Sequence, residues 1–128
     1  MRFIAIALAL VFLSALAIAA DNKTKPLTPA EAAKKVNEKC TVEMEVKSVG
    51  KSKGNYFMNS KDDFKAPDNF VVFINNVGVA RLREVKIEDP VAYYTNKTIR
   101  VTGMVKLFRD RPEIVVEKAD QIQVVEKN

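Results

Sequence analysis

Hydrophobic and polar residues alternate most clearly between Lys97 and Ile122. One face of this stretch carries Ile99, Val101, Gly103, Val105 and Leu107, and the other carries Arg100, Thr102, Met104, Lys106 and Phe108. A period of two residues is typical of a half-buried strand. Residues 109–112 interrupt the alternation and Ile114-Val115-Val116 resumes it, so the pattern predicts strands at 98–108 and 113–116 joined by a tight turn. A glycine in mid-strand, here Gly103, predicts a bulge or bend.

Three further strands are predicted earlier in the chain. They lie at 40–48, 56–59 and 70–74, and a short edge strand is expected at 121–125. Alternate residues of the first strand should point inward, namely Cys40, Val42, Met44 and Val46. The third is apolar on both faces and is therefore expected in the middle of a sheet. Residues 50–55 are predicted as a turn and residues 60–69 as a polar loop.

Helix signals occur at two places. Thr28, Pro29 and Glu31 form a capping-box pattern, which predicts a short N-terminal helix running to about Val36 or Asn37. The stretch Val79–Tyr94 loses the period of two and is predicted to be helical and broken at Pro90, with Asp89 as a cap. One face of this segment is expected to carry four apolar residues: Leu82, Val85, Val91 and Tyr94.

The order of these elements predicts a fold class. Five short strands with a helical segment between the third and the fourth, after a short N-terminal helix, are the order of an OB-fold, a mainly β, five-stranded Greek-key barrel. We expect this single domain to span residues 28–126, and residues 21–27 to form a flexible arm.

Three motifs in the second half of the chain are familiar from a known group of proteins. They are Asn96-Lys-Thr-Ile-Arg-Val-Thr-Gly-Met-Val105, Arg111-Pro-Glu-Ile-Val-Val116 and Gln121-Ile122. With them, residues 32–122 resemble the small bacterial OB-fold domains of the nucleic-acid-binding, tRNA-anticodon-like type, including exported stand-alone forms. Asn96 and Asp110 stand where that group usually has glycine, and both residue types tolerate a left-handed backbone.

The expected ligand surface of such a barrel is the face of its second and third strands, together with the loop between strands one and two, here Lys47–Asn55, and the loop between strands four and five, here Leu107–Pro112. The candidate residues are the basic and aromatic side chains of that surface: Lys47, Lys51, Lys53, Phe57, Phe108, Arg109 and Arg111. Cationic side chains contact phosphates and an aromatic ring, here Phe57, Phe108 or Tyr56, stacks on a base. The predicted partner is therefore single-stranded nucleic acid or another polyanion, with both loops on the same side of the barrel.

Other interpretations stay open. Lysines in turns are common on any soluble surface, and the loops or the edge at 121–125 could instead bind a protein partner. A degenerate nuclease would use Asp62, Asp63 and Arg81, although their spacing does not favour it. The aspartates at 62, 63 and 68 lack the glycine and glutamate of a calcium loop. The chain has no histidine and one cysteine, so we expect no zinc site and no histidine-dependent catalytic triad. No set of residues forms a catalytic pattern, so we expect no cofactor and no enzymatic activity.

The first twenty residues are typical of a secretory signal peptide. Arg2 precedes an apolar run from Phe3 to Leu13, and Ala17-Ile18-Ala19 fits the small-residue cleavage pattern, with Ala20 as the alternative end. The expected location is periplasmic or secreted, with no membrane contact after cleavage. Without Arg2 the chain keeps 20 basic and 16 acidic side chains, a formal charge of +4. The single Cys40 allows no internal disulfide and is expected in the core.

Overall fold

The structure is a computed structural model that describes residues 25–126. The chain is mainly β with short helices. The strands are β1 (Lys39–Glu45), β2 (Ser48–Ser52), β3 (Asn55–Asn59), β4 (Val71–Ile74), β5 (Thr98–Phe108), β6 (Arg111–Val116) and β7 (Ile122–Val124). The helices are α2 (Pro29–Ala32), α3 (Asn76–Glu84), α4 (Pro90–Tyr94) and the 3₁₀ helix η1 (Ala119–Gln121). The predicted signal peptide and most of the predicted arm lie outside the described residues.

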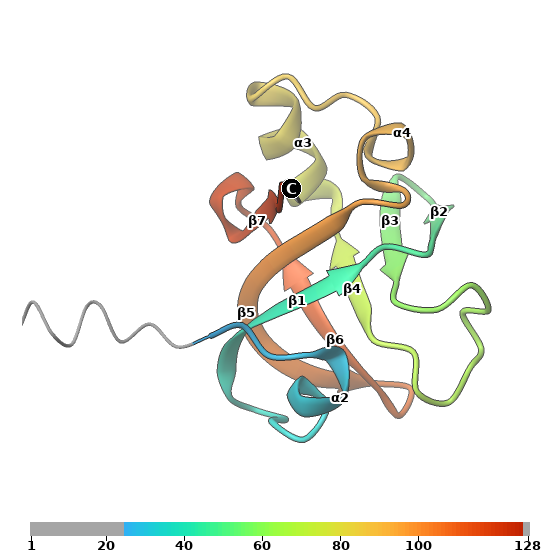
Figure 1. Ribbon diagram of the computed structural model, residues 1–128. Helices are drawn as coiled ribbons and strands as arrows, with labels where there is room; N and C mark the ends of the chain where they lie inside the picture. Colours follow the sequence, from blue (N-terminus) through green and yellow to red (C-terminus); the bar gives the residue numbers. More distant parts are fainter. Residues whose placement is uncertain (1–24, 127–128) are drawn as a thin grey trace, which may run out of the picture.

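The strands hydrogen-bond in the order β1-β5-β6-β4-β3-β2, and β7 adds to β5. All neighbours are antiparallel except β4 and β6, which run parallel. The two strands at the ends of this order, β1 and β2, follow each other in the chain with only Val46 and Lys47 between them. Figure 1 shows β5 as a long curved strand, which pairs with β1 through its first part and with β6 through its last.

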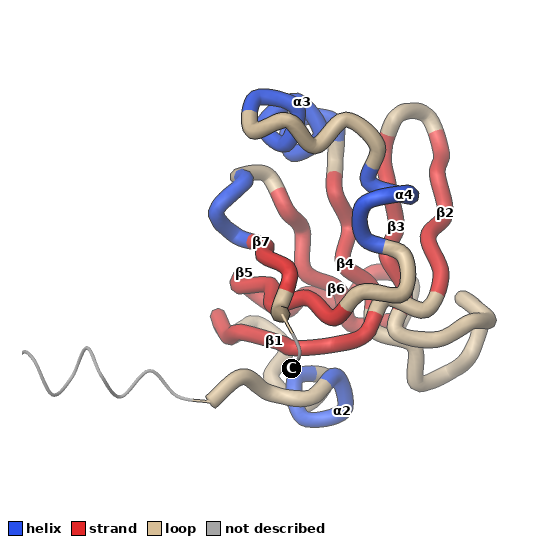
Figure 2. The backbone as a smooth tube through the Cα atoms, turned by 45° about the horizontal axis from the view of Figure 1, so that its top comes forward, coloured by secondary structure: helices blue, strands red, loops and turns tan. Residues whose placement is uncertain are grey.

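The core is built from the inward-facing residues of the strands. Fully buried side chains include Val42, Met58, Val72, Val101 and Ile114, each from a different strand. Burying one such side chain stabilises a fold by about 1.5–3 kcal/mol. The helices lie at the periphery of the strands (Figure 2), where they add Ala32, Val79, Leu82 and Tyr94 to the same cluster.

The alternation of β5 predicts its bounds and most of its facing correctly. Ile99, Val101 and Val105 are completely buried. A side chain at Gly103 would come 2.7 Å from Ile114, so this position gives β6 room to pack. The predicted inward position of Leu107 is wrong: its side chain is 55% exposed, because β5 runs past the core before it turns into β6.

The predicted turn at 50–55 is also wrong. Residues up to Ser52 continue as β2 and pair with β3, and the turn is confined to Lys53 and Gly54. Both turn residues have positive φ, 52° and 83°, as the tight two-residue hairpin turns require. β2 carries few apolar side chains, so its strand character comes from pairing rather than from a hydrophobic pattern.

The helices confirm their predicted caps but not all of their extents. Thr28 and Glu31 form the predicted capping box, yet α2 ends at Ala32 and tight turns replace the rest of the expected helix. Asp89 caps α4 through Val91 and Ala92, as predicted.

The predicted apolar face of the 79–94 segment is only half correct. Leu82 and Tyr94 are buried, whereas Val85 and Val91 are exposed. The chain breaks and changes direction between α3 and α4, so a single helical period does not carry across both. Within residues 25–126 no helix has the length and apolarity needed to cross a membrane.

A groove on the outer face of the sheet

The face of the sheet opposite the core carries a groove of about 500 Å³ across β2, β3, β4 and β6. Strand register sets two rows of side chains on this face of the sheet. Gly50, Phe57, Phe73 and Val115 are successive partners in one row, and the first two of them line the groove. Ser48, Asn59, Val71 and Glu113 are partners in the next. The first row is aromatic and apolar, and the second is mostly polar.

Aromatic rings lie on the floor and at the rim of the groove. The rings of Phe57 and Phe73 pack with centroids 4.8 Å apart at an angle of 38°, and both are half-buried. Phe64 and Phe108 contribute to the rim and are 61% and 52% exposed. Large exposed rings gathered at a hollow are typical of a surface that binds a partner.

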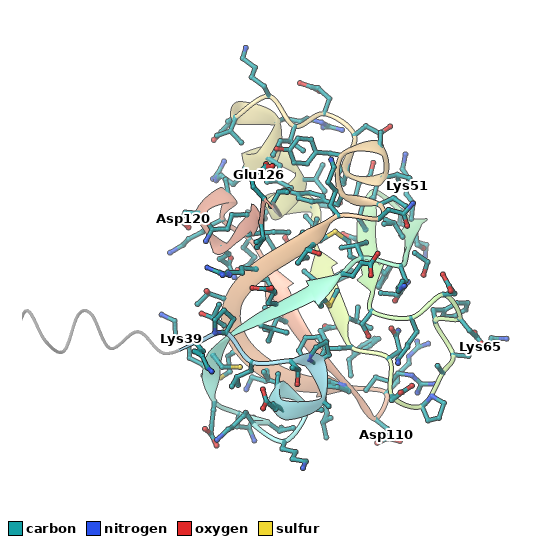
Figure 3. All side chains as sticks on the ribbon, viewed as in Figure 1. Lys39, Lys51, Lys65, Asp110, Asp120 and Glu126 are labelled. Atoms are coloured by element: carbon teal, nitrogen blue, oxygen red, sulfur yellow. The ribbon has the colours of Figure 1, made fainter. Side chains whose placement is uncertain are left out.

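Positive charges accompany the two rim rings. The guanidinium of Arg109 lies 5.2 Å from the ring centre of Phe108, and the ammonium of Lys65 lies 5.8 Å from that of Phe64. These distances are in the range of cation–π contacts. Four cationic side chains line the groove, together with Asp62 and Glu113, so positive charge predominates there. Figure 3 shows Lys51, Lys65 and Asp110 of the β5–β6 turn along one flank of the molecule.

A buried polar network fixes the 60–69 loop beside the groove. Asn69 donates from Nδ2 to Oδ1 of Asn59 at 3.0 Å and to the carbonyl of Phe64 at 3.2 Å. Its own Oδ1 accepts from the backbone N–H of Lys61 at 3.2 Å. The guanidinium of Arg111 donates to the carbonyl of Lys65 and ties this loop to β6. The loop therefore forms a positioned wall that presents Phe64 and Lys65.

Glu113 gives the floor an unusual acidic group. Its side chain is only 9% exposed and makes no ion pair with any described residue. Burial raises the pKa of its carboxyl group, because the charged form loses hydration and gains no cation in return. As pH falls, Glu113 therefore loses its negative charge at a higher pH than an ordinary glutamate does.

Five of the seven predicted residues line this groove, namely Lys51, Phe57, Phe108, Arg109 and Arg111. Lys47 does not, because it lies in the break between β1 and β2, where its ammonium pairs with Glu45 at 3.4 Å. Lys53 does not either, because it occupies the tip of the β2–β3 hairpin.

The expectation that the two loops share one side is wrong. Tyr56, next to the β2–β3 turn, pairs with Ile74, and Ile74 pairs with Val116 at the end of β6, whereas the β5–β6 turn precedes its start at Arg111. The two turns therefore lie at opposite ends of the sheet, and Lys51 reaches the groove from within β2. Tyr56 is buried and cannot act as a stacking surface.

Several of the remaining lining residues carry weaker signals in the sequence. Phe64 is a lone aromatic residue in a polar loop, and that isolation was the available clue. Gly50 and Glu113 could not be found this way, because their place depends on pairing between distant strands.

The geometry does not support a nuclease site or a calcium loop at the acidic residues. Arg81 pairs with Glu84 on α3 at 3.1 Å, and Asp68 pairs with Lys61 at 3.2 Å. Asp63 accepts from the N–H of Lys65 within its own loop. In the part of the chain that the structure describes, no group of three acidic, cysteine or histidine residues could hold a metal ion. Cys40 is half-buried, and burial raises the pKa of its thiol.

Solved structures of other proteins share this arrangement of strands. A putative aspartyl-tRNA synthetase from Leishmania major Friedlin matches 84% of the chain with a TM-score of 0.58 and 14% identity. Asparaginyl-tRNA synthetase from Pyrococcus horikoshii matches 80% with a TM-score of 0.52 and 14% identity. The chain covers 22% and 23% of these two proteins. OBody AM1L10, solved bound to hen egg-white lysozyme, matches 81% of the chain and 96% of its own length, with a TM-score of 0.55 and 18% identity.

The chain has an OB-type fold. No protein-family model matches its sequence, and no curated protein matches it either. In this OB-type fold β3 and β4 are the second and third strands of the predicted order, and the groove lies across both of them. The likeness to the synthetases and the OBody concerns this fold alone.

Proposed function

We propose that this protein binds single-stranded nucleic acid, or a polyanion of similar charge spacing, in the groove across β2, β3, β4 and β6. The observation that supports this most is the presence in one groove of four cationic side chains and two exposed rings, with Lys65 beside Phe64 and Arg109 beside Phe108. Non-specific single-strand binding needs this combination, a positive groove for the backbone and rings on which bases stack. The synthetases that share the fold act on tRNA by name, which agrees with this choice of partner.

The expected affinity is modest. The groove carries four cations and two acids, so few phosphates can be neutralised at once. Binding through so few contacts should fall in the range of roughly 10⁻⁴–10⁻⁶ M at physiological salt and tolerate changes of sequence. The function is then that of a binding module rather than an enzyme.

Fluorescence anisotropy with a labelled oligothymidylate at two salt concentrations tests the proposal. Affinity should fall as salt rises, because each neutralised phosphate releases counterions. Lys65→Ala with Arg109→Ala should weaken binding and flatten the salt dependence. Arg111 is left intact, since it also anchors the 60–69 loop. Phe108→Ala should weaken binding by about 1–3 kcal/mol if its ring stacks on a base.

A matched control removes the same charge elsewhere. Lys34 and Lys39 are exposed and lie outside the groove, and Figure 3 shows Lys39 on the flank opposite Lys51 and Lys65. Lys34→Ala with Lys39→Ala should change affinity much less than the groove pair. Equal losses in the two double variants, or no binding at low salt, would contradict a nucleic-acid groove.

The second candidate function is protein binding through the same face. OBody AM1L10 shares the fold over nearly its whole length and is bound to a protein. Two large exposed rings at a hollow also suit an apolar partner. This function predicts binding that depends on Phe64 and Phe108 but responds little to salt, which the same experiment separates from phosphate contacts.

The site of action that we propose is outside the cytoplasm. Its support is the apolar segment and small-residue cleavage pattern of residues 1–20. Free nucleic acid and other polyanions at that location would meet a protein whose formal charge after cleavage is +4.

A further inference from the structure

Gly50 is the one glycine of this chain at which neighbouring protein atoms would leave room for a side chain. The other three each have a close neighbour: an added Cβ would come 2.9 Å from Asn76 at Gly54, 2.2 Å from Val116 at Gly78 and 2.7 Å from Ile114 at Gly103. At Gly50 an added Cβ would meet no described atom within 4 Å.

The backbone does not require glycine at this position either. Among the four glycines only Gly54 has the positive φ that disfavours other residues. Gly50 lies inside β2 and pairs regularly with Phe57. Glycine weakens a strand interior because it is flexible and packs no side chain, and in such a place it often marks the close approach of a ligand.

The open space at Gly50 adjoins the aromatic floor of the groove. Directly paired residues on one face of an antiparallel sheet have Cβ atoms about 4.5–5.5 Å apart, so a side chain at position 50 would stand beside the ring of Phe57. Phe57 in turn packs on Phe73, which fixes its ring from the other side. The absence of a side chain at Gly50 therefore leaves the half-buried ring of Phe57 accessible from the β2 side.

We infer that Gly50 forms a slot in which a planar ring of the ligand, a nucleobase under the proposed function, lies against Phe57. Gly50 is thus a specificity-determining position: it admits a flat ring into the floor, whereas Lys65, Arg109 and Arg111 contact the backbone phosphates. The inference rests on the proposed nucleic-acid binding. It predicts in addition that the bases, and not only the phosphates, contribute to affinity.

The test combines a variant that fills the slot in the protein with an oligonucleotide that lacks bases. Gly50→Val adds a branched side chain that strands favour, so the fold should be as stable as before or more stable. Two probes carry equal numbers of phosphates, a labelled oligothymidylate and an abasic oligomer of the same length. The unchanged protein should bind the oligothymidylate about tenfold or more tightly than the abasic strand. Gly50→Val should abolish that difference, because it lowers affinity for the oligothymidylate much more than affinity for the abasic strand.

Ser52→Val is the matched control. Ser52 lies two residues further along β2, on the same face and outside the groove, so the same side chain there should preserve the preference for bases. Gly50→Ala, which adds a single carbon, should give an intermediate loss and serves if the valine variant does not fold.

The outcomes separate this inference from the proposed function. Salt-dependent binding in which Gly50→Val keeps the full preference for bases would overturn the slot and leave the polyanion function standing. Failure of the unchanged protein to bind either probe at low salt would overturn both.

Discussion

Glu113 occupies an unfavourable environment for a charged group. It is buried beside Val71 on β4 and faces Lys106 on β5 in register, yet it forms no salt bridge with Lys106. A carboxylate that loses water without gaining a cation costs free energy. This residue therefore weakens the fold at neutral pH and also opposes the positive charge of the groove.

Glu113→Gln should raise the melting temperature at pH 7. The pKa of Glu113 is raised on folding, so the stability that comes with its protonation is fully present below its unfolded pKa. That contribution is lost as pH rises through the raised pKa of the folded state. The variant should abolish this part of the pH dependence, which melting curves at mildly acidic and neutral pH would measure. A lower melting temperature at pH 7 would mean that the carboxylate has a stabilising partner.

The same substitution should strengthen binding of single-stranded nucleic acid at pH 7, because it removes a negative charge from the groove floor. Affinity of the unchanged protein should rise as pH falls through the raised pKa of Glu113. Anisotropy at several pH values checks this, and Glu113→Gln should lose that part of the pH response.

Val101→Asp should destabilise the fold by about 3 kcal/mol or more. Val101 is completely buried and lies between Val42 of β1 and Ile122 of β7. Met104→Asp is the matched control, because Met104 is on the same strand and 46% exposed. Thermal melting should show a large loss for Val101→Asp and a small change for Met104→Asp, and similar losses would contradict the observed facing of β5.

At the scale of elements, the 60–69 loop forms one wall of the groove, and hydrogen bonds of its own side chains position that wall. Asn59 is the last residue of β3, and Asn69 lies two residues before β4 begins. The hydrogen bond between their buried amides therefore fixes both ends of the loop. Buried amides hydrogen-bonded to each other and to the backbone define a single loop conformation.

Asn69→Ala should cost about 1–3 kcal/mol and release the loop. Its removal leaves the side-chain oxygen of Asn59 without its donor and the N–H of Lys61 without its acceptor. Hydrogen exchange should increase across residues 60–69, and nucleic-acid affinity should fall because Phe64 and Lys65 lose their position. Asp68→Ala, which breaks only the exposed pair with Lys61, should change stability by less than about 1 kcal/mol.

Prediction from sequence succeeded where one element determines its own structure. The strict alternation of β5 predicts its bounds because each residue reports its own burial, and Thr28 and Asp89 cap the helices they precede. It failed for β2, whose lysines and serines become a strand only through pairing with β3. Five lining residues of the groove were named from their basic or aromatic character, whereas Gly50, Glu113 and Phe64 join it through pairings and loop contacts that no local pattern contains.

At the scale of the whole molecule, the charge is spread over several surfaces and only part of it lies at the groove. Lys61 and Lys47 form exposed pairs with acids, whereas Lys51, Lys65 and Arg109 form no salt bridge among the described residues. Exposed pairs contribute little to stability. The unpaired cations are therefore the ones whose charge remains available to an anionic partner.

The mature protein should begin at Ala20 or Asp21. Positively charged Arg2, the apolar run and the Ala17-Ile18-Ala19 pattern predict removal of the segment before it by signal peptidase. Mass spectrometry of periplasmic or secreted material measures the start directly. A mature protein that keeps Met1 would contradict export by this route.

The pairing of β1 with β5 also determines when the molecule can fold. Lys39 pairs with Met104, so the first strand finds its neighbour only after most of the chain exists. The parallel pairing of β4 with β6 adds a second distant contact. Folds dominated by such distant contacts form slowly, in milliseconds to seconds. At a synthesis rate of about 5–20 residues per second, several seconds pass between the synthesis of β1 and that of β5. Throughout that interval the growing chain is unfolded and can bind chaperones or enter an export channel.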